Sequence, residues 1–306
     1  MGEARGRRTF SRSFRRRAGG GPAGAGFSYD RLMPDRVAIA SIRRVGGGAS
    51  HTDQDLVAVE APLAVELAQA GTDERRPLGV FMRTPGDDGD LVLGLLYSEG
   101  LVRARADVAA LTSRPEHEGP ETMTAVLRAG IDLASVGGRL LTATSACGLC
   151  GRLAVESVSG LARYARPTPA APLRADVIAA LPDRLRREQA VFAETGGLHA
   201  AGLFAADGTL QLLREDVGRH NAVDKVVGAA LDAGDVPAVG RLLAVSGRVA
   251  FEIVQKAVLL GVEAIVAVGA PSSLAVDAAR AGRVVLVGFA RDGRFNVYAG
   301  AERIAD

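Results

Sequence analysis

The chain has only two cysteines and no tryptophan in 306 residues. The two thiols, Cys147 and Cys150, have only two residues between them, so they cannot form the disulfide framework that holds small secreted domains together. A reducing cytoplasm suits this cysteine content, and we expect a cytoplasmic protein. No stretch approaches the roughly 20 consecutive apolar residues that a membrane-spanning helix needs, so no membrane association is expected.

Lysine is as rare as cysteine, because only Lys225 and Lys256 occur and arginine supplies nearly all the positive charge. The formal net charge is +2, but arginines cluster in residues 1–35, which are otherwise mostly glycine, serine and alanine. Such a segment cannot bury enough apolar surface to offset the entropy of ordering it, so it is predicted to be a disordered tail. A nucleic-acid-binding arm is the alternative interpretation. We favour a solvated extension and expect no nucleic-acid partner.

Two features of this tail concern targeting and the start of the chain. Arg7 and Arg8 resemble a fragment of a twin-arginine export signal, but no apolar core follows them, so export is not expected. Met33 is a candidate natural start, with the preceding residues coming from an over-long gene prediction. Peptides from residues 1–32 in native protein would exclude that interpretation.

Residues 36–165 are predicted to form a smaller, β-rich α+β domain that ends in the loop with both cysteines. Leucines with helical spacing between Leu91 and Leu101, with Gly100 as the stop, predict one helix. Short apolar or alternating runs predict strands over Asp55–Glu60, Leu63–Leu67, Leu78–Arg83, Met123–Leu127 and Arg139–Leu141.

Residues 166–306 are predicted to form a second, α/β domain. Spaced prolines between Arg163 and Leu173 indicate a linker, and a helix is predicted over residues 175–191. Its expected buried stripe consists of Val177, Leu181, Leu185 and Ala190. Strands at 199–205 and 209–214 follow, and Asp207-Gly208 between them predicts a hairpin.

Three helix–strand units come next and define the fold class. The predicted helices span residues 218–231, 250–260 and 274–281, and the predicted strands span residues 241–245, 264–268, 284–289 and 294–299. A hairpin followed by alternating helices and strands predicts a mixed sheet covered by helices on both faces, a three-layer α/β/α domain.

Ligands of such sheets bind beyond the carboxyl ends of the strands, which here singles out four loops. They are Arg214–Arg219, Ser246–Arg248, Gly269–Ser273 and Phe289–Arg294. A loop that enters a helix offers free backbone amides to anions, and the arginines add positive charge. Together the loops predict a site for a phosphorylated, purine-bearing ligand. None matches a P-loop or a GxGxxG motif, so helix capping and turn formation are the favoured explanation of any one loop taken alone.

Three interpretations compete for the C-x-x-C motif. A zinc site needs about four ligands, and the four histidines, His51, His117, His199 and His220, have no paired ligand spacing. A thioredoxin-like dithiol is expected beside a βαβ redox unit, which the sequence does not show here. A persulfide carrier suits an exposed, glycine-flanked loop, and Arg152 could help to hold a thiolate. We favour the persulfide carrier and expect no metal.

Several motifs together resemble the formate dehydrogenase accessory protein family, the FdhD-type sulfur carriers. The resemblance runs from about residue 37 to the end, and its most specific parts are the CGxCG motif and the RxDxGRHNAxDK block. The matching segments are Met82–Gly86, Gly94, Ser98–Gly100, Thr144–Gly151, Arg214–Lys225, Ser246–Arg248, Val287–Phe289 and Gly293–Arg294.

The resemblance implies a sulfurtransferase that accepts persulfide sulfur from a cysteine desulfurase. It implies delivery of this sulfur to the molybdenum or tungsten bis(molybdopterin guanine dinucleotide) cofactor that formate dehydrogenase needs. The persulfide-bearing cysteine of the family corresponds to Cys147, and the second cysteine of the family's motif, with a secondary role, corresponds to Cys150. The cofactor-binding stretch corresponds to Phe289, Ala290, Arg291, Asp292, Gly293 and Arg294, and we expect Arg219, Ser246 and Arg248 to assist it.

The resemblance also implies a large domain similar to the cytidine deaminase fold, without the zinc motif of deaminases. A non-catalytic cofactor-binding chaperone is the alternative function, because it needs the basic loops but not the thiols. The choice between molybdenum and tungsten, the formate dehydrogenase served, the role of Cys150 and the oligomeric state, with a homodimer as one option, stay open at this point.

Overall fold

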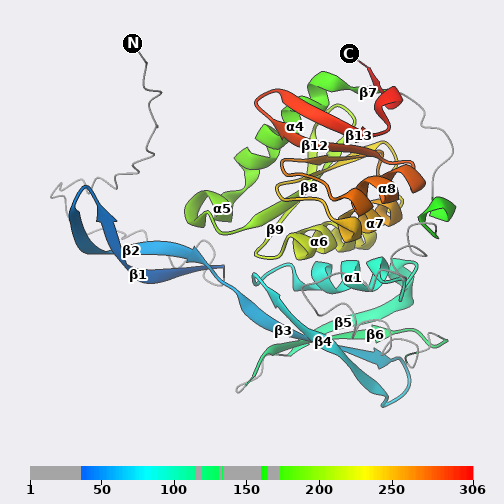
Figure 1. Ribbon diagram of the computed structural model, residues 1–306. Helices are drawn as coiled ribbons and strands as arrows, with labels where there is room; N and C mark the ends of the chain where they lie inside the picture. Colours follow the sequence, from blue (N-terminus) through cyan, green and yellow to red (C-terminus); the bar gives the residue numbers. More distant parts are fainter. Residues whose placement is uncertain (1–35, 115–118, 131–132, 134–159, 165–171, 306) are drawn as a thin grey trace, which may run out of the picture. The chain divides into compact units, whose positions relative to one another are not determined.

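The computed structural model describes residues 36–114, 119–130, 133, 160–164 and 172–305 (Figure 1). The predicted tail, the predicted strand Arg139–Leu141, most of the predicted linker, and both Cys147 and Cys150 lie outside these residues. The described part contains one six-stranded sheet, one four-stranded sheet and smaller β pairs.

The six-stranded sheet is mixed, as the sequence predicts. Its strand order is β13-β12-β11-β10-β8-β9. The three central neighbours β10, β11 and β12 are parallel, and the remaining pairs are antiparallel. The strands are β8 (His199–Ala205), β9 (Leu210–Asp216), β10 (Arg241–Val245), β11 (Ala264–Ala267), β12 (Val285–Arg291) and β13 (Arg294–Ala299).

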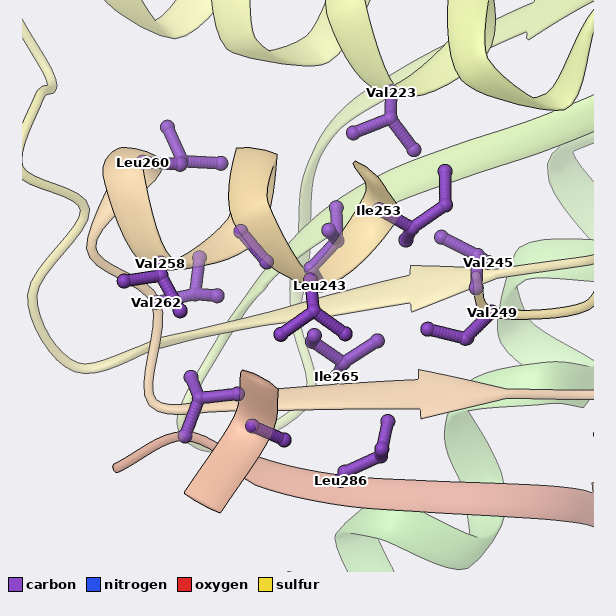
Figure 2. Packing of buried hydrophobic residues seen from close by; sticks show 14 of the residues in the cluster. Val223, Leu243, Val245, Val249, Ile253, Val258, Leu260, Val262, Ile265 and Leu286 are labelled. Atoms are coloured by element: carbon purple, nitrogen blue, oxygen red, sulfur yellow. The ribbon is translucent and has the colours of Figure 1, made fainter. Parts of the chain in front are cut away.

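Helices cover both faces of this sheet, which confirms the three-layer prediction. Alternate residues of a strand point to opposite faces, so Leu243 and Val245 pack on one side and Leu242 and Ala244 on the other. The first side is covered by α6 (Arg219–Asp232), α7 (Phe251–Leu260) and α8 (Ser273–Ala281). Figure 2 shows Leu243, Ile265 and Leu286 of the strands in one cluster with Ile253 and Val258 of α7. The second side is covered by α4 (Ala175–Glu188).

The predicted helix over residues 175–191 is two helices, because the chain leaves the helical conformation at Gln189 (φ −76°, ψ 82°). The second helix, α5, spans Ala190–Thr195. Val177, Leu181 and Leu185 are buried as predicted. Ala190 is exposed, so its assignment to the buried stripe is wrong: the break turns the chain, and Val191 is buried instead.

The four-stranded sheet has the order β4-β3-β6-β5, with a parallel β3–β6 pair at its centre. Its strands are β3 (Ala61–Gln69), β4 (Arg75–Arg83), β5 (Val108–Arg114) and β6 (Glu121–Leu127). Leucines of α1 (Asp88–Ser98) pack on one face, and α1 ends just before Gly100, as predicted. Strand β5 has no counterpart in the prediction.

Helix α1 also packs against α6, where the two backbones nearly touch. A Cβ atom on Gly94 of α1 would lie 1.8 Å from the carbonyl oxygen of Asp224, and one on Gly228 of α6 would lie 1.8 Å from that of Asp90. Only glycine fits at such an approach. The close crossing joins the helix of the four-stranded sheet to the helical layer of the six-stranded sheet.

A two-stranded hairpin precedes the four-stranded sheet. It consists of β1 (Val37–Gly46) and β2 (Ala49–Ala58), joined at Gly47 and Gly48. The predicted strand Asp55–Glu60 is therefore misplaced: β2 starts six residues earlier and ends at Ala58. Polar residues fill the first part of β2 and conceal its strand character, and most of the hairpin is exposed.

Smaller elements complete the described chain. They are the paired strands β7 (Leu173–Arg174) and β14 (Ile304–Ala305), and the 3-10 helices Arg105–Asp107, Ala162–Tyr164 and Ala301–Arg303. None of the helices in the described residues is both long and apolar enough to span a membrane. A domain boundary near residue 165 and a likeness to the cytidine deaminase fold stay predictions.

Candidate functional site

The four predicted loops meet at one end of the six-stranded sheet. The Phe289 amide donates to the Gly269 carbonyl (3.1 Å), and the Gly269 amide donates to the Gly247 carbonyl (3.2 Å). A Cβ atom on Gly247 would lie 3.6 Å from the Cβ of Arg219, so the loop before α6 lies next to these three loops. The four loops thus form a row, in which the starts of α6, α7 and α8 lie near the ends of β10, β11 and β12.

A pocket of about 430 Å³ opens beside this row, on the face of the sheet covered by α4. Its walls come from the end of α4, from α5, and from the ends of β10, β11 and β12. The lining residues are Pro182, Asp183, Leu185, Arg186, Gln189, Phe192, Gly196, Gly197, Leu198, His199, Ser246, Val268, Ala290, Arg291 and Asp292. An apolar floor with a few polar groups at its edges is typical of a small-ligand site.

The structure brings some of the predicted site residues into this pocket and leaves others outside it. Ser246, Ala290, Arg291 and Asp292 line it, whereas Phe289, Gly293, Arg294, Arg219 and Arg248 do not. Cys147 and Cys150 lie outside the described residues, so their position relative to the pocket is not described.

Two of the lining residues have clear structural tasks. The Ser246 hydroxyl accepts a hydrogen bond from the Ala200 amide (2.9 Å), which ties β10 to β8 at the pocket edge. Ala290 is fully buried and belongs to the core on the α4 face. Both residues therefore shape the pocket, and the Ser246 hydroxyl still has its hydrogen to donate to a ligand.

The β12–β13 turn presents two arginines that form no ion pair with any of the described residues. Arg291 and Arg294 face each other across the antiparallel pair, and both are exposed. Like charges opposite each other in a sheet are destabilising. Neither guanidinium forms an ion pair with the part of the chain that the structure describes. An anion between or beside them would relieve this repulsion.

Backbone strain marks the same turn. Phe289 has φ 53° and is 40% exposed, although bulky side chains rarely adopt this left-handed conformation. Asp292 (φ 52°) and Gly293 (φ 70°) form the turn itself. Strained residues of this kind concentrate at functional sites, so Phe289 is a candidate contact residue outside the pocket.

The polar block Arg214–Lys225, by contrast, is almost entirely engaged within the fold. The Lys225 ammonium lies 2.8 Å from the Asp216 carboxylate, and neither side chain is exposed to solvent. Lys256 pairs with Asp224 (2.7 Å), and Arg214 pairs with Asp90 (2.7 Å). Most of the block thus builds the structure.

Several hydrogen bonds of the block reach the end of β4 and the residues that follow it. Lys225 also donates to the Thr84 carbonyl (2.8 Å), and the Thr84 amide donates to Asp216 (3.1 Å). Asn221 donates to the Met82 carbonyl (2.9 Å). The segment around Thr84 is therefore held against the start of α6 by buried, charge-assisted hydrogen bonds, which are stronger than neutral ones.

Only two side chains of the block keep a buried polar atom without a hydrogen-bond partner among the described residues. These atoms are Nε of Arg219 and Nε2 of His220. Arg219 stands at the start of α6, where the backbone amides also attract anions. The prediction that Arg219 assists ligand binding is compatible with this position.

Two histidines near this end of the sheet have lowered pKa values. Burial lowers the pKa of His199 and the charge of Arg219 lowers it further, while Asp216 opposes the shift. Burial also lowers the pKa of His220, with help from Arg219 and Lys256. Both imidazoles are therefore neutral near pH 7, and His199 can donate or accept a hydrogen bond in the pocket.

Sequence reasoning missed several lining residues, among them Arg186, Gln189, Phe192 and His199. Arg186 belongs to the helix predicted over residues 175–191, Phe192 lies just beyond its predicted end, and His199 is predicted to start a strand, with zinc binding as the function weighed for it. The glycine pair Gly196-Gly197 just before β8 is the signal that could have marked the pocket, because it lets the chain turn between α5 and His199. The described residues hold no group of three or more side chains that could bind a metal ion.

Comparison with known proteins gives consistent results. Residues 58–305 match the model of the FdhD/NarQ family. The chain is 47% identical over 256 residues to the sulfur carrier protein FdhD of Nocardia farcinica, covering 82% of this chain and 88% of the relative. It is 48% identical over 282 residues to the protein of the same name from Anaeromyxobacter sp. strain K, covering 88% and 93%.

A solved structure has the same fold. It is the crystal structure of a proposed formate dehydrogenase accessory protein from Desulfotalea psychrophila. The TM-score is 0.67, the sequence identity is 22%, and the match covers 88% of this chain and all of the other.

Proposed function

Because the chain belongs to the FdhD/NarQ family, we propose that it is a sulfur carrier that serves the maturation of formate dehydrogenase. The curated relatives carry the name sulfur carrier protein. The observation that carries the proposal is that a chain of this family has only two cysteines and that both occur in a single motif, Cys147-x-x-Cys150. Two thiols reserved for one glycine-flanked loop are suited to accepting and passing on sulfur.

The proposed loading step is a transfer between two thiols. The Cys147 thiolate attacks the terminal sulfur of a persulfide on a cysteine desulfurase. A new S–S bond forms on Cys147, the S–S bond of the desulfurase persulfide breaks, and the desulfurase cysteine leaves as a thiolate. No electrons are gained or lost overall. Cys150 has a secondary role, as a thiol that can resolve the persulfide or shield it.

The proposed recipient is the molybdenum or tungsten bis(molybdopterin guanine dinucleotide) cofactor, which we treat as cargo of the protein. It carries pyrophosphates, which favour arginines and helix N-termini. Arg291 and Arg294 at the β12–β13 turn supply positive charge that no described residue pairs with, and Arg219 and Arg248 lie at or near helix starts. Ser246 and Asp292 lie at the pocket edge. The stretch Phe289–Arg294 thus has the chemistry to hold a dinucleotide.

The proposed partners follow from these two steps. A cysteine desulfurase supplies the sulfur and formate dehydrogenase receives the modified cofactor, both in the cytoplasm. A homodimer would present two such sites to one bis-dinucleotide cofactor. Its formation can be checked by the mass of the protein in solution.

Mass spectrometry after incubation with a cysteine desulfurase and cysteine tests the proposal. The tryptic peptide with Cys147 should gain the mass of one sulfur atom, and a reductant should remove it. Cys147→Ala should gain no sulfur, whereas Cys150→Ala should still be loaded. Loading of Cys147→Ala to the wild-type level would contradict the assignment.

A cofactor-binding chaperone without sulfur transfer is the second candidate. The specific observation that favours it is that, among the described residues, Arg186, Arg291 and Ser246 already give the pocket charged and polar groups suited to a phosphorylated ligand. Such a protein would support formate dehydrogenase activity in cells after replacement of both cysteines by serine. We expect that activity to be lost.

A further inference from the structure

Gln189 is buried in the pocket wall, but its amide nitrogen has no hydrogen-bond partner in the part of the chain that the structure describes. The side chain lies between α4 and α5, is 2% exposed and lines the pocket. Its Nε2 atom donates no hydrogen bond to any of the described residues. Leaving a buried amide donor unpaired costs free energy, so proteins seldom retain one without a reason.

The structure shows why this side chain is not used to hold the fold together. Gln189 occupies the N-cap position of α5, where a side chain usually accepts hydrogen bonds from the first amides of the helix. Here the carboxylate of Glu215 accepts from the Val191 amide (3.0 Å) and from the Phe192 amide (2.9 Å) instead. Glu215 comes from β9 and is itself buried. The amide nitrogen of Gln189 thereby has no partner among the described residues and can donate to a ligand.

A planar surface adjoins this free donor. The guanidinium of Arg186 lies 3.8 Å from the centre of the Phe192 ring, and both residues line the pocket. Stacked guanidinium and aromatic groups bind the flat faces of nucleobases. The pocket therefore combines one surface for stacking with one buried donor for the edge of a base.

We propose that Gln189 is the residue that selects guanine, by donating a hydrogen bond from Nε2 to an acceptor on the base edge, while Arg186 and Phe192 stack on the base. This inference rests on the proposed function, in which the cargo contains guanine dinucleotides. Guanine presents the acceptor O6 where adenine presents an amino donor. A donor fixed in a buried wall favours guanine, because adenine would leave both donors unpaired.

Binding of three nucleoside diphosphates to the full chain tests the assignment. GDP and IDP both carry the O6 acceptor, and IDP lacks the amino group of guanine, whereas ADP lacks the acceptor. Gln189→Met keeps the length of the side chain and removes the amide. It should weaken GDP and IDP about tenfold each and leave ADP unchanged, so that the preference for guanine over adenine disappears.

Two further variants give the contrast. Gln211→Met makes the same substitution at an exposed position of β9 outside the pocket lining and should change no affinity. Phe192→Leu removes the stacking surface and should weaken all three nucleotides to a similar extent, because stacking does not distinguish bases.

Thermal unfolding separates ligand recognition from a structural role. Because the amide nitrogen donates to none of the described residues, Gln189→Met should not lower the melting temperature of the unliganded protein. A fall in melting temperature with unchanged GDP affinity would show that Gln189 serves the fold and would overturn the proposal. Equal weakening of ADP and GDP would overturn it as well.

The outcome also distinguishes this inference from the proposed function. Persulfide loading of Cys147 does not require the pocket, so it should persist in Gln189→Met. If the wild-type chain is loaded with sulfur but binds no GDP, the sulfur carrier stands and the guanine site is wrong. If it binds GDP with a preference that depends on Gln189 but is never loaded, the inference stands and the sulfur carrier is wrong.

Discussion

Two regions at the same end of the sheet contain many charged residues and use them differently. In the block Arg214–Lys225, the charges are mostly buried and paired within the chain. In the turn Phe289–Arg294, two arginines face each other in solvent without an ion pair to any described residue. A prominent polar motif in a sequence can therefore be structural, while a less prominent stretch supplies the proposed ligand contacts.

The largest expected effect on stability comes from breaking the buried ion pair Lys225–Asp216. Lys225→Met leaves the Asp216 carboxylate buried without its counter-charge, and removing one partner of a buried pair costs about 3–5 kcal/mol. We expect a loss of this size in the free energy of unfolding, measured with urea. A loss below about 1 kcal/mol would show that the block is not the structural centre described here.

The next effect concerns the crossing of α1 and α6. Gly94→Ala places a methyl group against the Asp224 carbonyl and should cost about 1–3 kcal/mol, because the helices must separate. Gly89→Ala is the matched control on the same helix: its Cβ would lie 3.6 Å from a Leu111 methyl, an ordinary contact. This control should be neutral or stabilising, because alanine favours helix. Equal effects of the two variants would contradict the close crossing.

At the turn Phe289–Arg294 we expect the opposite: substitutions should affect ligand binding and leave stability nearly unchanged. The double variant Arg291→Ala, Arg294→Ala should change the free energy of unfolding by less than about 0.5 kcal/mol. It should weaken GDP binding roughly tenfold in low salt, and less as salt is raised, because exposed charges are screened. Arg187→Ala, an exposed arginine of α4 outside the pocket lining, should have no effect on binding.

The smallest effect is a dependence of stability on pH. Burial and the charge of Arg219 lower the pKa values of His199 and His220, so the unfolded chain takes up protons at a higher pH than the folded one. Unfolding therefore becomes easier as pH falls below the ordinary histidine value of about 6.5 towards the lowered native values.

His220→Gln should make this loss of stability smaller between about pH 7.5 and 5.5. His51→Gln, on the exposed hairpin, serves as the control and should behave as wild type. A wild-type chain whose stability does not change over this range would contradict the lowered pKa values. Urea unfolding at a series of pH values provides the measurement.

The sequence predicts the six-stranded sheet well, because its strands and helices have clear periods and its turns contain Asp-Gly or Gly. It predicts the hairpin β1–β2 and strand β5 poorly, because polar residues interrupt their alternation. The break at Gln189 was not predictable from local sequence. It depends on Glu215, which is distant in the chain and caps α5 through tertiary contact.

The meeting of the four loops was predictable from the sequence, but the pocket beside them was not. Loops rich in glycine and arginine identify the end of the sheet, and the structure brings them into one row. The wall from Arg186 to His199 carries no local signal of its own. Its residues become a pocket only when α4 and α5 pack across the ends of β10, β11 and β12.

The central claim is that one chain carries sulfur on Cys147 and binds the nucleotide part of its cargo at the turn Phe289–Arg294. The most direct test measures persulfide loading and GDP binding side by side in two variants. Cys147→Ala should lose loading and bind GDP as wild type does, whereas the Arg291→Ala, Arg294→Ala variant should load normally and bind GDP poorly. Normal loading of Cys147→Ala, or unchanged GDP binding of the arginine variant, would contradict the account.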